Sequence, residues 1–210
     1  IVLLVVPFWH SLVHADDAGA VELEEVVVYA QKRGVAEAQL DLPVSITAHS
    51  GEEVWVRGAT TLEDIGYLQP NVRLNPQITV PHLANFYIRG MGVNGSVVSD
   101  EPAVGVHLDG MYLGVSAGVL MDFIDLDRVE VLRGPQGTLF GHSATAGVVS
   151  VSSLGPSFEN ELRAEMKVGD NRTHGISATL SGPLGQSERF AGRLSVHAAA
   201  NDPLYRNISP

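Results

Sequence analysis

The sequence contains no cysteine, and it has few aromatic residues (6%) and few cations. Without cysteine the chain forms no disulfide, no thiolate zinc site and no cysteine nucleophile. The 13 Lys and Arg are outnumbered by 24 Asp and Glu, for a net charge of -11, which argues against a protein that binds nucleic-acid phosphates through a basic face. Hydrophobic residues make up 45% of the 210 residues, so the chain as a whole is not intrinsically disordered and can form one or two domains.

The chain opens on an apolar run that is too short and too interrupted for a membrane-spanning helix. The run is IVLLVVPFWHSLVHA, with Pro7 and His10 inside it. It is typical of the apolar region of a secretory signal peptide, and small residues follow at cleavage spacing, as Val13-His14-Ala15 or Ala18-Gly19-Ala20. A buried strand is the alternative. We therefore expect residues 1–20 to be a signal peptide remnant. Because no Met precedes the run and no closing element ends the chain, we expect a fragment at both ends.

Residues 21–39 are acidic at first and then rich in β-branched residues. The tetrad Val26–Tyr29 favours a strand, and no partner strand is evident nearby in the sequence. We therefore expect an exposed segment that can pair with a strand of another protein, followed by a linker. A plain disordered linker is the alternative.

Residues 40–155 predict a small mixed domain of short strands and short helices. Ser50 and Glu53 form a capping-box pattern that predicts a short helix to about Arg57, and Thr61 begins a second helix that ends before Pro70. Glycine-rich turns separate the β-prone segments. The expected strands are residues 43–48, 85–89, 104–108, 128–132 and 147–152.

The last quarter of the chain changes to strict alternation of apolar and polar residues. Three segments of about ten residues have one apolar and one polar face, which is the length and pattern of transmembrane β-strands. An ordinary antiparallel meander with one wet face is the alternative. The apolar positions are Leu162, Ala164, Met166 and Val168, then Ile176, Ala178 and Leu180, then Phe190, Gly192, Leu194 and Val196.

Two short motifs suggest enzymes but lack the context that those enzymes need. Residues 90–95 spell GxGxxG, yet no helix pattern follows to present its N-terminus to a dinucleotide. Residues 114–118 spell GxSxG around Ser116, yet no long helices alternate with strands as in a serine hydrolase. The eight His are scattered without metal-ligand spacing. We therefore expect no catalytic residue, no metal site and no cofactor.

Four ordered blocks resemble one known family. They are LEEVVVYAQKR (23–33), FYIRGMG (86–92), PAVGVHLDGMYLG (102–114) and DLDRVEVLRGPQGTLFGHSATAGVVSVSS (125–153). Together they resemble the plug domain of TonB-dependent outer-membrane receptors. The resemblance implies an α+β plug domain over 40–155, with a small mixed β-sheet and short helices, and then the first antiparallel strands of a transmembrane β-barrel over 156–210. The chain departs from the family at His142-Ser143, Ala146 and Ser150, where Arg-Asn, Gly and Asn are usual.

The plug motif contains turn residues and charged residues. Glycines around Pro135 allow sharp turns after a strand, and Asp109-Gly110 is a hairpin signal. The resemblance implies that Arg89 and Arg133 face carboxylates on the inner barrel wall, a pairing that a buried guanidinium needs; surface arginines on a soluble domain are the alternative. The implied plug-motif and wall-contact residues are Arg89, Gly90, Asp109, Gly110, Glu130, Arg133, Gly134, Pro135, Gly137 and Gly141.

The β-prone segment is similar to the family's TonB box. Its residues are Glu24, Glu25, Val26, Val27, Val28, Tyr29 and Ala30. The resemblance implies that the TonB energy transducer of the inner membrane captures this box, and an extended segment can do so by adding as a strand to a sheet edge. Tyr29 stands where Thr is common.

The implied function is energised uptake of a scarce extracellular ligand, such as a ferric siderophore, through the outer membrane of a Gram-negative cell. The implied location is the outer membrane, with the plug facing the periplasm and lipid around the strands. An isolated periplasmic plug-like binding or signalling module without a barrel is the alternative, and a serine hydrolase is the enzyme alternative.

Overall fold

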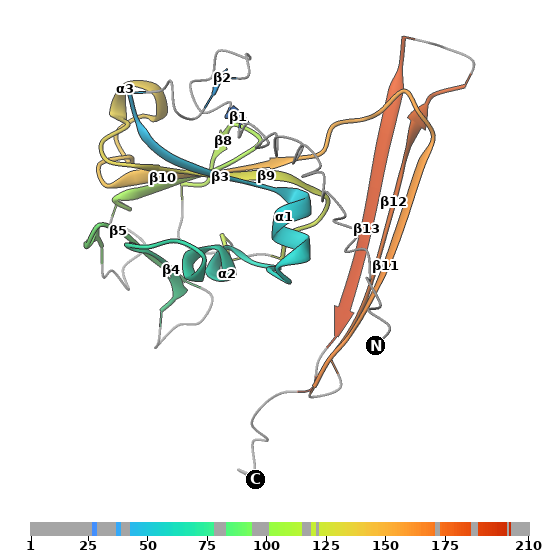
Figure 1. The fold of residues 1–210 in the computed structure, drawn as a ribbon, viewed down its shortest axis with the longest axis horizontal. Helices are drawn as coiled ribbons and strands as arrows, with labels where there is room; N and C mark the ends of the chain where they lie inside the picture. Colours follow the sequence, from blue (N-terminus) through green and yellow to red (C-terminus); the bar gives the residue numbers. More distant parts are fainter. Residues whose placement is uncertain are drawn as a thin grey trace, which may run out of the picture.

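The structure is a computed structural model that describes residues 27–28, 37–38, 43–77, 83–93, 101–114, 119–120, 122–170, 173–185, 189–200 and 202. The expected signal peptide remnant, Ser116 of GxSxG and the end of GxGxxG lie outside the described residues. The described chain forms a mixed domain, here called the plug, and a separate antiparallel sheet (Figure 1). None of its described helices is long and apolar enough to cross a membrane. The fold class expected from the sequence is confirmed.

The plug is built on a five-stranded sheet of order β3-β9-β10-β7-β8, here called the plug sheet. Strand β10 pairs antiparallel with β9 and parallel with β7, so the sheet is mixed. Strand β3 lies at one edge and pairs only with β9 among the described strands, antiparallel from Ser45↔Arg133 to Ser50↔Arg128. The strands are β3 (Ser45–Ser50), β9 (Leu126–Arg133), β10 (Gly147–Ser153), β7 (Val104–Leu108) and β8 (Met111–Tyr112).

Two short helices begin where the sequence signals predicted. Helix α1 (Gly51–Val56) has Ser50 as its N-cap, whose hydroxyl accepts from the Glu53 amide. Helix α2 (Leu62–Tyr67) has a reciprocal capping box between Thr61 and Asp64. Burial alone would raise the pKa of Asp64, but hydrogen bonds from Thr60 and Thr61 together lower it.

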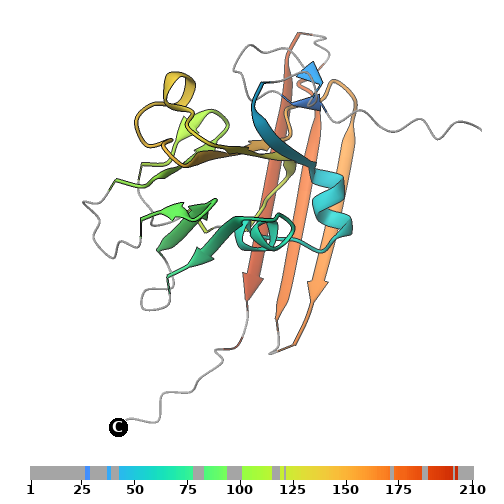
Figure 2. The same cartoon turned by 60° about the vertical axis from the view of Figure 1, so that its left-hand side comes forward.

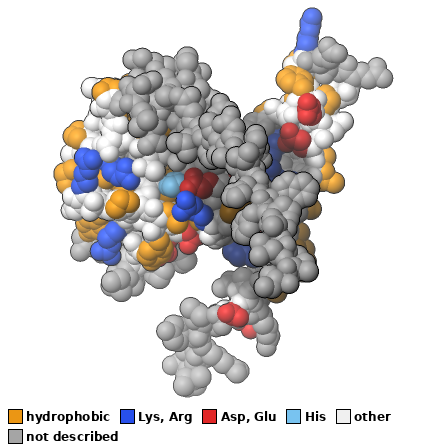
Figure 3. Space-filling model, in the orientation of Figure 1, with side chains coloured by type: hydrophobic (Ala, Val, Ile, Leu, Met, Phe, Trp, Pro, Cys, Tyr) orange, Lys and Arg blue, Asp and Glu red, His pale blue; other side chains and the backbone are white. Residues whose placement is uncertain are grey.

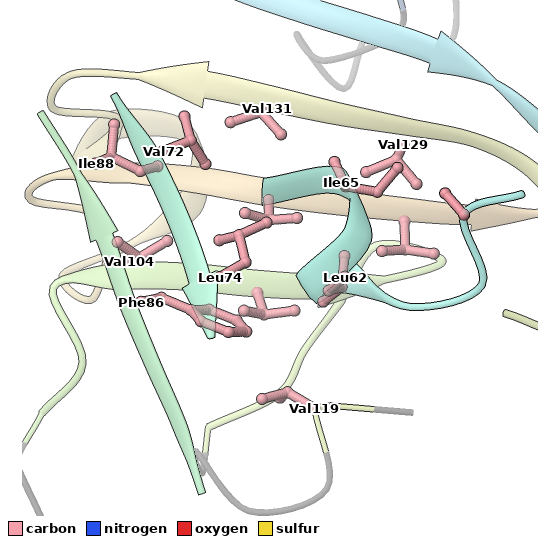
Figure 4. Close-up of a cluster of buried hydrophobic side chains, with 14 of the residues drawn as sticks. Leu62, Ile65, Val72, Leu74, Phe86, Ile88, Val104, Val119, Val129 and Val131 are labelled. Atoms are coloured by element: carbon pink, nitrogen blue, oxygen red, sulfur yellow. The ribbon is translucent and has the colours of Figure 1, made fainter. Parts of the chain in front are cut away.

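A second small sheet completes the plug and encloses its core. It contains β4 (Val72–Pro76), β5 (Ala84–Ile88) and β6 (Met91–Gly92), all antiparallel. The core lies between this sheet with α2 and one face of the plug sheet (Figure 4). Its fully buried side chains include Ile65, Leu74, Ile88, Val129 and Val131.

The opposite face of the plug sheet carries a smaller apolar cluster. Ile46, Leu132 and Val148 come from neighbouring strands and pack with Ala144 and Val28. Val28 belongs to β1 (Val27–Val28), which pairs antiparallel with β2 (Glu37–Ala38). The N-terminal segment is therefore packed onto the plug at this residue.

The separate sheet, here called the wall sheet, has one apolar and one polar face. Strands β11 (Glu161–Val168), β12 (His174–Pro183) and β13 (Ala191–Ala200) follow one another antiparallel. Their register aligns apolar rows such as Leu162–Leu180–Leu194, and these three side chains are exposed. Figures 1 and 2 show the plug beside one face of this sheet, and hydrophobic side chains are visible along its right-hand side in Figure 3.

Substituting Gly51 with alanine is expected to destabilise the plug by about 1–3 kcal/mol, because overpacking forces the backbone to shift. A Cβ at Gly51 would lie 2.0 Å from the carbonyl oxygen of Leu126. Denaturant unfolding of the purified protein measures the loss. Gly137→Ala is the matched control, since a Cβ there meets nothing within 4 Å at the start of α3 (Gly137–Phe140). Equal stability of the two variants would contradict the prediction.

Candidate functional site

The described part of the expected TonB box has a partner strand, which the sequence did not predict. Val27 pairs with Ala38 and Val28 pairs with Glu37. Val28 is fully buried in the cluster with Ile46 and Leu132. The expectation of an unpartnered segment is wrong at these two residues, because Glu37 and Ala38 are poor strand formers and gave no signal. The other box residues, Glu24, Glu25, Val26, Tyr29 and Ala30, lie outside the described residues.

The turn after β9 needs glycine at two of its three expected positions. Gly134 and Gly141 have φ of +99° and +87°, in the region that favours glycine. Gly137 lies in α3, has no such φ and has room for a Cβ, so a sharp turn does not require it. Pro135 lies between two hydrogen bonds that close the loop, from Gly134 N to Ala146 O and from Gln136 N to Ala144 O.

Asp109 and Gly110 form the tight turn between β7 and β8, as the sequence predicted. Both have positive φ, +49° and +81°, which is the two-residue hairpin geometry. Asp109 has a further contact that the sequence did not reveal. Its carboxylate accepts from the Ser153 amide at 2.8 Å and from the Ser153 hydroxyl at 2.9 Å. The turn therefore holds the end of β10, where the chain leaves the plug.

Arg89 and Arg133 lie near each other on the plug. Arg89 and Gly90 form the turn between β5 and β6, both with positive φ. Arg133 donates to the Thr47 hydroxyl at 2.8 Å and to Gln69 Oε1 at 2.9 Å. Burial, with the charge of Arg89, lowers the pKa of Arg133 from its ordinary value. Among the described residues no carboxylate pairs with either arginine, and the expected wall carboxylates stay a prediction.

Glu130 is a carboxylate buried within the plug sheet. It is 2% exposed, on the face that also carries Leu132, and pairs in register with Ala48 and Ser150. Its Oε1 lies 3.5 Å from Nε of Arg128. Glu130 is therefore buried within the plug, and its expected role as a plug-motif or wall-contact residue stays a prediction.

The plug contacts the wall sheet through residues that sequence reasoning missed. Asp125, just before β9, accepts from Nη2 of Arg193 on β13 at 2.7 Å and also pairs with Arg193 Nε. The Ser195 hydroxyl donates to Asp125 Oδ2 at 2.7 Å. Asp125, Arg193 and Ser195 are called the wall contact below. No local motif marks them, because the two sides are more than sixty residues apart.

The wall contact keeps the Asp125 carboxylate charged. Hydrogen bonding from Arg193 lowers the pKa of Asp125 below its ordinary value, against the opposing effect of burial, and Ser195 adds to the shift. A lowered pKa in the folded state means that the contact stabilises the fold above the ordinary carboxyl pKa and is lost only as pH falls through the lowered value. The contact therefore persists throughout the neutral and mildly acidic range.

The first enzyme-like motif has a different local structure from a dinucleotide site. Met91 and Gly92 form strand β6, which pairs back onto β5, where the dinucleotide motif needs the start of a helix. Within the described ranges no group of three His, Asp or Glu could hold a metal ion.

Comparison with known proteins finds receptors among the relatives of this chain. The chain is 28% identical over 166 residues to the ferrioxamine B receptor of Salmonella typhimurium, covering 77% of this chain and 22% of the relative. It is 27% identical over 162 residues to the pesticin receptor of Yersinia pestis, covering 76% and 23%. The chain thus spans less than a quarter of the length of these relatives.

Solved structures show the same fold. The ferric yersiniabactin uptake receptor of Yersinia pestis matches with a TM-score of 0.66 and 26% identity, over 73% of this chain and 24% of that one. The ferripyoverdine receptor of the outer membrane of Pseudomonas aeruginosa matches with a TM-score of 0.69 at 21% identity, over 83% and 22%, and shows the fold alone. The family model "TonB-dependent Receptor Plug Domain" matches residues 38–148, more than half of the chain. The chain therefore belongs to the TonB-dependent receptor plug domain family.

Proposed function

We propose that this chain is part of an outer-membrane receptor that takes up a ferric siderophore with energy from the TonB transducer. The observation that carries the proposal is the arrangement of its two parts. A plug of the receptor family lies against the polar face of a sheet whose opposite face is apolar. The ferrioxamine B receptor and the ferric yersiniabactin uptake receptor, at 28% and 26% identity, are receptors for ferric ligands by name, which supports this ligand class.

The wall sheet has the chemistry of a barrel segment between lipid and plug. Its exposed apolar rows suit hydrocarbon, and its polar rows carry Arg193 and Ser195, which bind the plug. In hydrocarbon its backbone edges must pair, so the sheet has to continue into a closed barrel. A longer receptor supplies those strands.

The TonB box supplies the route for energy. A β-prone segment binds a partner by adding a strand to the partner's sheet edge through backbone hydrogen bonds. Here one edge of Val27–Val28 is occupied by β2, and the Val28 side chain lies in the plug cluster. Transducer binding therefore uses the other edge of β1 or displaces β2.

Uptake by the complete receptor tests the proposal. Cells that lack their own ferric siderophore receptors would express the full reading frame and be offered radioiron as ferrioxamine B, yersiniabactin or pyoverdine complexes. We expect accumulation of one of them that stops with a protonophore or without TonB. A reading frame that ends soon after residue 210, or surface binding without accumulation, would instead favour the isolated module.

Labels on the two faces of the wall sheet are expected to meet different solvents. Spin labels at Leu162, Met166 and Leu194 should be relaxed by lipid-soluble oxygen in a bilayer, because their side chains form the apolar face. Labels at Arg163 and Glu165 should respond to a water-soluble nickel chelate. Equal accessibility of both faces would contradict a position in the membrane wall.

A further inference from the structure

Asp125 and Arg193 form a charge pair between two separately folded parts of the chain. Asp125 lies in the plug and Arg193 in β13, and their side chains are 7% and 9% exposed. Two nitrogens of the guanidinium meet the two carboxylate oxygens, and Ser195 binds the same carboxylate. This fork geometry is the strongest form of an Arg–carboxylate pair.

The backbone on the plug side places Asp125 for this contact. Asp125 has φ of +57°, a left-handed conformation that few non-glycine residues adopt. Its carbonyl accepts from the Leu154 amide at 2.9 Å, just after β10 ends. Nearby, the Phe123 amide donates to Thr60 O at 2.7 Å, which ties the segment to the start of α2.

The wall side is fixed as well. Arg193 Nη1 lies 3.2 Å from Glu161 Oε2 and 3.4 Å from Gly155 O. Gly155 belongs to the connector between plug and wall, and on that connector the Ser157 amide donates to the Ser181 hydroxyl at 2.9 Å. Farther along β13, His197 lies 4.0 Å from Asp122. The alternate β13 residues Arg193, Ser195 and His197 thus lie against the plug segment 122–125.

We propose that the pair Asp125–Arg193 seats the plug on the wall, at the point where the chain passes from one to the other. The two charges are placed the other way round from the pairing that the family resemblance implies. Here the plug supplies the carboxylate and the wall sheet supplies the guanidinium. Both side chains are buried at the contact, so loss of Arg193 leaves a buried carboxylate without its cation, and loss of Asp125 leaves the guanidinium with only the half-exposed Glu161. The contact between the plug and the wall sheet is then weakened next to the connector.

The test uses the complete receptor in cells and in detergent, without ligand or transducer. Asp125→Asn and Arg193→Gln each remove one charge, and the swap Asp125→Arg with Arg193→Asp restores a pair of opposite charges. Glu161→Gln is the matched control, because Glu161 contacts the same guanidinium but is half-exposed. Two readouts apply: proteinase K cleavage of the plug in purified receptor, and sensitivity of cells to vancomycin, which is too large to cross an occluded barrel.

We expect each single variant to be cleaved at least about tenfold faster than the unaltered receptor, with raised vancomycin sensitivity, and the swap to recover much of both. Glu161→Gln should behave like the unaltered receptor. Single variants as resistant as the unaltered receptor, or a swap no better than the singles, would overturn the proposal. Barrel folding is checked by the heat-dependent shift in gel mobility, and the swap keeps the test decisive if one single variant does not assemble.

This inference rests on the proposed function only in treating the wall sheet as part of a barrel. The protease readout depends on the contact between plug and sheet alone. A receptor that fails to import any ferric siderophore, yet shows the cleavage pattern above, would remove the proposed ligand and leave the contact in place.

Discussion

Val27→Pro is expected to abolish energised uptake by the complete receptor while ligand binding at the cell surface persists. Proline removes the amide donor and fixes φ, so the proposed TonB box can no longer pair as a strand along its length. Every buried residue of the main plug core lies between Val54 and Val151, so we expect the change at residue 27 to leave the ligand-binding surface intact. The measurement compares radioiron accumulated at 37 °C with radioiron bound at the surface in the presence of a protonophore.

Val27→Ala is the control for this variant, because it shortens the side chain but keeps the amide. We expect its uptake to stay within about twofold of the unaltered receptor, since strand addition depends on backbone hydrogen bonds. Undiminished uptake by Val27→Pro would refute the assignment of the box. Loss of surface binding as well would indicate damage to the plug instead.

Residues 16–210 expressed alone are expected to aggregate, whereas residues 16–153 are expected to be soluble and monomeric. The longer piece carries the wall sheet, in which β11 and β13 are edge strands among the strands that the structure describes, and all eight residues of β11 are exposed. Such edges and an exposed apolar face favour pairing between molecules. The exposed hydrophobic residues include Leu162, Met166, Val168, Ile176, Leu180, Leu194 and Val196.

The shorter piece keeps what the plug needs to fold. Every buried member of the main core lies between residues 54 and 151, so removal of the wall sheet takes none of them away. It does unpair Asp125, which then becomes solvated. Size-exclusion chromatography without detergent compares the two pieces. A clean monomer of residues 16–210 would make the wall sheet an ordinary soluble meander and favour the isolated module.

The features that the sequence predicted are those that neighbouring residues determine. Caps at Ser50 and Thr61 fix both helix starts within one turn, and the Asp109-Gly110 turn needs only its own backbone. The alternating strands β11–β13 also agree with the prediction. Alternation of apolar and polar residues places them on opposite faces of a strand, and so indicates a strand directly. The plug motif identified the family through four such local blocks.

The features that the sequence did not predict depend on contacts between distant residues. The pairing of β1 with β2 uses Glu37 and Ala38, which have no strand preference, and is decided by the burial of Val28 in the plug cluster. Asp and Arg are common on protein surfaces, so Asp125 and Arg193 gave no signal in the sequence. Only the folded chain shows that they form a pair. The same holds for the parallel pairing of β7 with β10, which no short turn specifies.

Strand β3 lies at the edge of the plug sheet, and this position sets how much of the sheet its departure disturbs. Taking away β9 or β10 would break two ladders, whereas taking away β3 breaks one ladder, the six pairs with β9, together with the packing of Ile46 and the hydrogen bond to Thr47. Of the plug-sheet strands, β3 is also the one nearest in sequence to the proposed TonB box. Its loss leaves the β9–β10–β7 ladders intact. The topology of the plug thus separates one edge strand, whose loss breaks a single ladder, from a central group of strands that keep their pairing.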